Sequence, residues 1–167
     1  VLVCNHMLTP TDTPRILDVP LETQSRMLDI NARAYMNLVQ RFGTQMRDRG
    51  RGAIVIVSSI GGLRGSPVLG AYCISKAADL QLARNLAVEY GPHNIRVNCI
   101  APGLIKTDFA KALWDNPDNL KASTARSPLL RIGIPDEIAG AAVFMGSAAG
   151  NFMTGQTVVI DGGATIS

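Results

Sequence analysis

The sequence predicts an α/β protein built on a doubly wound parallel sheet. Short β-branched runs alternate along the chain with longer segments of helical periodicity, which is the order of parallel strands joined by right-handed crossover helices. The run 53–57 reads AIVIV without a polar residue, so we expect helices to cover both of its faces. A length of 167 residues fits one domain.

Each predicted element has a local signal in the sequence. Apolar residues recur every three or four positions between Met27 and Phe42, which indicates an amphipathic helix that ends near Arg47 and Arg49. Turn-forming residues fill 9–14, before this helix. The polar segment 104–127 is expected to form a lid over the substrate or a loosely ordered loop. Strands are predicted at 1–3, 53–57, 96–100 and 157–160, and further helices at 72–90 and 135–145.

Composition excludes several classes of protein. A hydrophobic content of 47% with 17% charged residues excludes a disordered chain, and the longest apolar run is too short to span a bilayer. The net charge is +3 and the basic residues are scattered, so we expect neither a nucleic-acid nor a membrane partner. Cys4, Cys73 and Cys99 are too widely spaced for a disulfide framework or a metal site, which favours a cytoplasmic location.

Three polar sites follow the predicted strands. In parallel sheets, ligands bind beyond the carboxyl ends of the strands. Asn5 follows the first predicted strand, Ser59 the second, and Pro102 and Gly103 the third. We therefore expect these residues to lie at the ligand-binding edge.

Tyr72 and Lys76 form the clearest candidate for chemistry. They are four residues apart at the start of a predicted helix, so they share one face of it. An ammonium close to a phenol favours the phenolate, and we expect it to lower the pKa of Tyr72 from about 10. Such a Tyr could exchange protons with a substrate, while the Ser59 hydroxyl donates to a substrate oxygen.

In context, these residues resemble the Ser…Tyr-x-x-x-Lys signature of the short-chain dehydrogenases/reductases. The separation of Ser59 and Tyr72 by thirteen positions matches that family's usual pattern. Three further stretches resemble the family in the right order: LDINARA at 28–34, NIRVNCIAPGLIKT at 94–107 and MTGQTVVIDGG at 153–163. The resemblance covers essentially the whole chain and implies a Rossmann-like fold.

The resemblance implies hydride transfer between NAD or NADP and a small-molecule alcohol or carbonyl substrate. Tyr72 would be the acid/base, Lys76 would lower its pKa and bind the nicotinamide ribose, and Ser59 would orient the carbonyl. Asn31 would hold a water that relays protons to Lys76. The family commonly forms homodimers or homotetramers, so we expect an oligomer here.

The cofactor side of the site is also implied by the resemblance. Beside Tyr72 and Lys76, it would include residues from the segments that follow two strands. These are Asn5, Pro102, Gly103, Ile105 and Thr107, with the last two against the nicotinamide carboxamide. No metal ligand is expected.

Two departures from the family pattern stand out. The family's Asn-Asn-Ala-Gly segment aligns with residues 4–7, where Asn5 fits and Met7 replaces Gly; we expect His6 to be a partly buried structural residue. No glycine-rich phosphate loop follows any strand, so we expect the family's first three strands, about 80–90 residues at ~30 per βαβ unit, to be absent from this chain. Residues 1–167 would then be a partial domain that is inactive alone.

Two alternatives to a dehydrogenase remain open from the sequence. A catalytically inactive truncated family member could act as an oligomerisation or interaction module. An epimerase or dehydratase would keep the family but change the chemistry. The intact set of Ser59, Tyr72, Lys76 and Asn31 favours the dehydrogenase.

Overall fold

A computed structural model describes residues 1–8 and 15–167 of the chain, and four parallel strands form its sheet. The strands lie side by side in chain order, β1-β2-β3-β4. Each predicted strand is present, and β2 and β3 extend slightly beyond the predicted bounds. The strands are β1 (Leu2–Cys4), β2 (Gly52–Val57), β3 (Ile95–Pro102) and β4 (Thr157–Ile160). The turn-rich stretch 9–14 lies outside the described residues.

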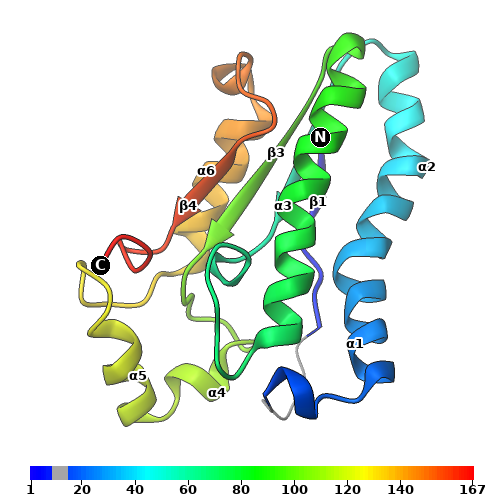
Figure 1. The fold of residues 1–167 in the computed structure, drawn as a ribbon. Coiled ribbons are helices and arrows are strands. Elements are labelled where there is room, and N and C mark those ends of the chain that lie inside the picture. The colour runs from blue at the N-terminus through cyan, green and yellow to red at the C-terminus, as the bar shows by residue number, and fades with distance from the viewer. Residues whose placement is uncertain (9–14) are drawn as a thin grey trace.

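Helices cover both faces of the sheet, as the apolar run in β2 predicts (Figure 1). One face carries α1 (Leu21–Leu28), α2 (Ala34–Asp48) and α3 (Gly70–Tyr90), and the other carries α6 (Pro135–Gly146). Ile54 and Ile56 pack with α2 and α3, whereas Val55 packs with Met145 of α6. The alternation of side chains along β2 therefore builds a separate apolar core on each face.

The helix predicted from Met27 to Arg49 is divided in the structure. A π-helical stretch, Asp29–Arg33, separates α1 from α2. This stretch places Asn31 in the interior, and π turns are rare features that often occur at functional sites. The sequence gives no sign of the π turn. The buried positions Met27, Asn31 and Tyr35 are four residues apart, which is also the spacing of an ordinary α-helix.

Helix α3 is the central helix of the site and combines buried polar and exposed apolar residues. Ser75, Lys76 and Asp79 are buried on its inner side. Ile74 and Val88 are 49% and 80% exposed on its outer side. No helix in the described ranges has both the length and the apolar character needed to cross a membrane. The expected oligomerisation stays a prediction.

The segment 104–127, for which a lid or a loosely ordered loop is predicted, contains two short helices, α4 (Lys111–Trp114) and α5 (Pro117–Thr124). They lie beyond the carboxyl ends of the strands, at the lower edge of the view in Figure 1. The indole N–H of Trp114 donates to the Thr107 carbonyl at 2.9 Å, which ties α4 to the segment leaving β3. The Asn116 side chain accepts from two backbone N–H groups of α5 and caps it.

The loop after β2 lies close to helix α3 at Gly62. A substitution at Gly62 therefore tests how tightly the two pack. A Cβ at Gly62 would lie 2.7 Å from the Lys76 carbonyl oxygen, a backbone atom that cannot move aside cheaply. Gly62→Ala should therefore lower the free energy of unfolding by about 1–3 kcal/mol, measured by urea denaturation. Gly65→Ala is the matched control, because a Cβ there meets nothing within 4 Å. Equal stability of the two variants would contradict the packing described.

Candidate active site

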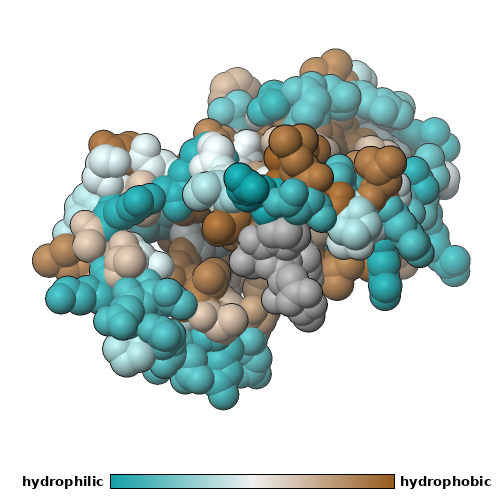
Figure 2. All heavy atoms as spheres, turned by 60° about the horizontal axis from the view of Figure 1, so that its bottom comes forward, coloured by the Kyte–Doolittle hydropathy of each residue, from teal (hydrophilic) through white to brown (hydrophobic). Residues whose placement is uncertain are grey.

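The expected edge residues come together because β1 and β3 are both neighbours of β2. Asn5 follows β1, Ser58 and Ser59 follow β2, and Gly103 follows β3, all at the carboxyl edge of the sheet. Figure 2 views the molecule from this end and shows a hollow whose walls include hydrophobic side chains. The prediction of a ligand-binding edge at these positions is thus consistent with the fold.

The loop after β2 fixes Ser59 against the start of α3. The Ser58 hydroxyl donates to the Lys76 carbonyl at 2.8 Å, and the Gly61 N–H donates to the Ser59 hydroxyl oxygen at 3.0 Å. Gly62 lies against the same Lys76 carbonyl. These contacts hold the Ser59 hydroxyl near the first turns of α3, where Tyr72 lies.

Tyr72 is only 7% exposed, and its hydroxyl lies 3.7 Å from the Met7 sulfur. Burial raises the pKa of Tyr72 to about 12, the Ser59 hydroxyl lowers it, and the charge of Asp79 raises it further. This direction is opposite to the expected lowering of the Tyr72 pKa by Lys76. The phenol is therefore protonated at neutral pH in this structure.

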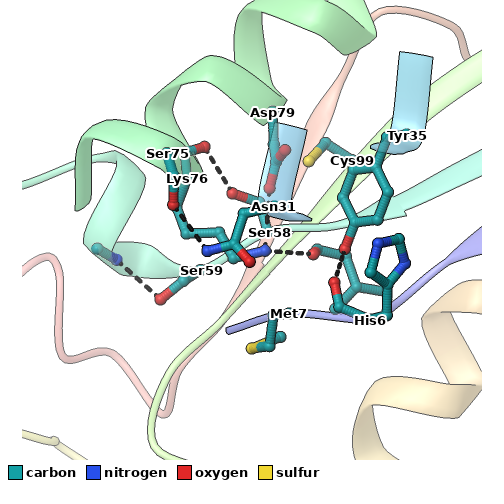
Figure 3. A network of polar contacts seen from close by, with 12 residues as sticks. His6, Met7, Asn31, Tyr35, Ser58, Ser59, Ser75, Lys76, Asp79 and Cys99 are labelled. Atoms are coloured by element: carbon teal, nitrogen blue, oxygen red, sulfur yellow. Dashed lines mark hydrogen bonds and ion pairs between the residues drawn. The ribbon is translucent and has the colours of Figure 1, made fainter. Parts of the chain in front are cut away.

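Burial of the phenol is the main cause of the difference, and the Lys76 ammonium does not offset it because its own hydrogen bonds hold it in the core. Lys76 is completely buried, and its Nζ donates to Asp79 Oδ2 at 3.0 Å and to the Val57 carbonyl at 3.2 Å (Figure 3). The ammonium lies 5.6 Å from the centre of the Tyr35 ring and 5.9 Å from that of Tyr72. Two of its three N–H groups are thus engaged in the core, and one remains for another partner.

Asn31 is completely buried and joins two separate segments to each other. Its amide nitrogen donates to the Leu8 carbonyl at 2.9 Å and to the Ser75 hydroxyl at 3.0 Å. Its amide oxygen accepts from the Leu8 N–H at 2.6 Å. Both hydrogens of the Asn31 amide group are therefore already donated. The water that is predicted to relay protons to Lys76 would have to be held by another atom of this segment. The water-holding role of Asn31 stays a prediction.

The remaining expected cofactor residues lie on the segments that leave β1 and β3. Asn5 is exposed directly after β1. Pro102 is the last residue of β3, and Gly103 packs so closely on Asp161 that a Cβ would lie 2.8 Å from its Cα. Ile105 forms a parallel bridge with Gly133, and the Thr107 hydroxyl oxygen accepts from the Ala110 N–H at 3.3 Å. Their contacts with a cofactor stay predictions.

His6 differs from its expected environment. The expectation of partial burial is wrong, because His6 is exposed in the structure. Its ring meets the Tyr35 ring edge-on at 4.8 Å between centroids, and its carbonyl accepts from the Tyr35 hydroxyl. The exposure follows from its place beyond the end of β1, where the chain leaves the sheet.

Sequence reasoning missed two residues of the polar network, Ser75 and Asp79, and it placed Ser58 beside Ser59 at the ligand-binding edge without assigning it a role. The Ser75 hydroxyl donates to the Tyr72 carbonyl at 2.7 Å and accepts from Asn31. Asp79 was detectable as an acidic residue one turn after Lys76 on a helix whose neighbouring positions are apolar. Among the described residues, no group of three or more His, Cys, Asp or Glu could hold a metal ion.

A parallel sheet with helices on both faces and polar side chains beyond the carboxyl ends of its strands is a doubly wound α/β domain of the kind that binds ligands at this edge. A family model described as enoyl-(acyl carrier protein) reductase matches residues 1–165. The chain belongs to the short-chain dehydrogenase/reductase family.

Known relatives are similar to this chain over nearly all of its length. Dehydrogenase/reductase SDR family member 4 of Bos taurus is 42% identical over 164 residues, which cover 98% of this chain. The corresponding Homo sapiens protein is 40% identical over 163 residues. The match covers 58% of the length of each of these two relatives. This chain therefore spans less than two thirds of the length of these two relatives.

Solved structures show the same fold. A gluconate 5-dehydrogenase from Burkholderia cenocepacia, in complex with NADP and tartrate, matches with a TM-score of 0.95 and 29% identity. That match covers 99% of this chain and 64% of the gluconate dehydrogenase. A short-chain type dehydrogenase/reductase from Mycobacterium marinum matches with a TM-score of 0.90 and 36% identity, over the same shares of the two chains.

Proposed function

We propose that the chain forms the catalytic part of an NAD(P)-dependent oxidoreductase that interconverts an alcohol and a carbonyl compound. The observation that carries this proposal is the placement of Ser59, Tyr72 and Lys76 together at the carboxyl edge of the sheet. Membership of the family and the NADP bound to the gluconate dehydrogenase relative support it.

In the proposed reduction, Tyr72 is the proton donor. Because its pKa is raised to about 12, the phenol carries its proton at neutral pH and can give it to the substrate oxygen as negative charge develops there. Ser59 donates a hydrogen bond to the same oxygen and fixes the carbonyl in reach of Tyr72. The nicotinamide supplies or accepts the hydride when it is bound.

The residues of this edge fit the nicotinamide half of such a cofactor. The remaining N–H of Lys76 can donate to a ribose hydroxyl once the ammonium, which is completely buried here, is reached from the edge of the sheet. The backbone of residues 103–107 offers donors and acceptors for a carboxamide. The segment's Thr107 and Ile105 and the exposed Asn5 complete this donor set. The choice between NAD and NADP is not encoded in these residues.

The pyrophosphate half has no matching residues in the sequence. The 167 residues contain no Gly-x-x-x-Gly-x-Gly stretch, and the glycines of 61–65 lie in the loop between β2 and α3. The glycine loop and helix N-terminus supply much of the affinity for a dinucleotide. We infer that these groups come from outside residues 1–167 in the active enzyme.

An inactive interaction module is the less favoured function. Such a module would have no need to keep the buried Lys76 beside Tyr72, and burial of an ammonium costs free energy. The structure retains this pair with the Ser59 loop held against it.

A cytoplasmic location remains part of the proposal, since Cys4, Cys73 and Cys99 are all unpaired.

Replacement of Tyr72 by Phe tests the proposed acid/base role. In the protein in which this chain occurs, Tyr72→Phe should reduce kcat for NADPH-dependent reduction of an aldehyde or ketone roughly 10²- to 10⁴-fold. The ring remains, so affinity for NADPH should change less than about twofold. Tyr90→Phe, at the other end of the same helix, is the matched control and should keep its activity. Activity of Tyr72→Phe close to that of the unaltered protein would show that another group transfers the proton.

Residues 1–167 by themselves should bind NADPH very weakly, because they hold partners for one end of the cofactor only. Fluorescence titration of the purified chain with NADPH and with NADH measures this. Neither nucleotide should saturate the chain in the micromolar range. Submicromolar binding of either would contradict the inference that the pyrophosphate partners lie outside these residues.

A further inference from the structure

Asp79 is a buried carboxylate for which the mechanism above has no use. Both Asp79 and Lys76 have 0% exposed side chains, and one carboxylate oxygen pairs with the ammonium at 3.0 Å. The other oxygen, Oδ1, is buried and has no hydrogen-bond partner among the described residues. Burying a charged pair of which one oxygen stays unsatisfied is poor for stability. Stability alone therefore does not explain why Asp79 and Lys76 are buried together.

The groups that face Asp79 come from every element packed around it. They are Lys76 and Tyr72 of α3, Tyr35 of α2, Cys4 of β1 and Cys99 of β3. Figure 3 shows Asp79 beside Cys99 and the Tyr35 ring, above the Lys76 ammonium. The two tyrosines and two cysteines among these groups are neutral acids. Burial is the main cause that raises the pKa of each, and the negative charge of Asp79 raises it further.

The pairing with Asp79 fixes the position of the Lys76 ammonium and makes the net charge of the two side chains zero. The ammonium lies between Asp79 Oδ2 and the Val57 carbonyl, on the inner side of α3. An ammonium alone at 5.9 Å from the Tyr72 ring would favour the phenolate, but the adjacent carboxylate opposes this effect. With Asp79 ionised, Tyr72 therefore experiences a neutral pair in place of a cation.

We propose that Asp79 is a positioning residue of this site, which holds the Lys76 ammonium in the core and offsets its charge at the Tyr72 phenol. The proposal rests on the proposed function, since it assigns the state of the acid/base group.

The ionisation of Tyr72 can be followed directly in the purified chain by NMR. The chain is labelled with carbon-13 at the tyrosine ring carbon that bears the hydroxyl, and Tyr72→Phe identifies the Tyr72 signal. Asp79→Asn keeps the shape of the side chain but removes its charge. We expect the proton affinity of the Tyr72 phenol to fall at least about tenfold in Asp79→Asn, so that it ionises at lower pH. Asp79→Glu restores the charge and should restore the original midpoint.

A matched control separates charge from loosened packing. Asn98 is a buried polar residue of β3 whose amide bonds the Met153 carbonyl and the Gln156 N–H, away from Lys76. Asn98→Ala should leave the Tyr72 midpoint unchanged. If Asn98→Ala lowers it as much as Asp79→Asn, or if Asp79→Asn does not lower it, the proposal is wrong.

A measurement on the unaltered chain decides the matter if Asp79→Asn does not fold. Burial raises the pKa of Asp79 to about 6, against the opposing effect of Lys76. When the Asp79 carboxyl carbon titrates, the Lys76 Cε and the Tyr72 ring carbon should shift with it. A Tyr72 signal that stays constant while Asp79 titrates would overturn the proposal. These readings need no turnover. A protein that reduces no carbonyl compound would refute the proposed function and leave the test of Asp79 intact.

Discussion

The burial of one ammonium group, that of Lys76, is the constraint on which the rest of the site depends. A buried cation requires partners, and here they come from the end of β2 and from the next turn of α3. The backbone of the same residue accepts from Ser58, and Gly62 packs against it. The pairing that satisfies the charge therefore also fixes the loop that carries Ser59 and the helix that carries Tyr72.

A second connection extends this arrangement to the chain that follows β1. Asn31, in the π-helical stretch, bonds to both backbone groups of Leu8 and to Ser75, and Ser75 bonds to the Tyr72 carbonyl. The segment with Met7 is thereby held over the Tyr72 hydroxyl. Segments that are far apart in the sequence thus define the surroundings of a single phenol, and each bond is buried or partly buried and sheltered from water.

How far the sequence predicts this structure depends on the range of the interactions involved. The strands and the pairing of Tyr72 with Lys76 on one helix face follow from local patterns, because pleat and helix periods act over a few residues. The π turn is not predictable in this way, since the bond of Asn31 to Leu8 joins residues 23 positions apart. The same holds for the direction of the Lys76 ammonium. Asp79, three residues later, was the one local sign that the ammonium would be drawn into the core.

The most direct test of the proposed hydride transfer is to follow deuterium from NADPH into the product. NADPH that carries deuterium at both hydrogen positions of the nicotinamide C4 is incubated with the protein in which this chain occurs and with a panel of aldehydes and ketones. Mass spectrometry then locates the label in the products. The account predicts an alcohol with deuterium on the former carbonyl carbon. An alcohol without the label, or no alcohol from any member of the panel, would contradict it.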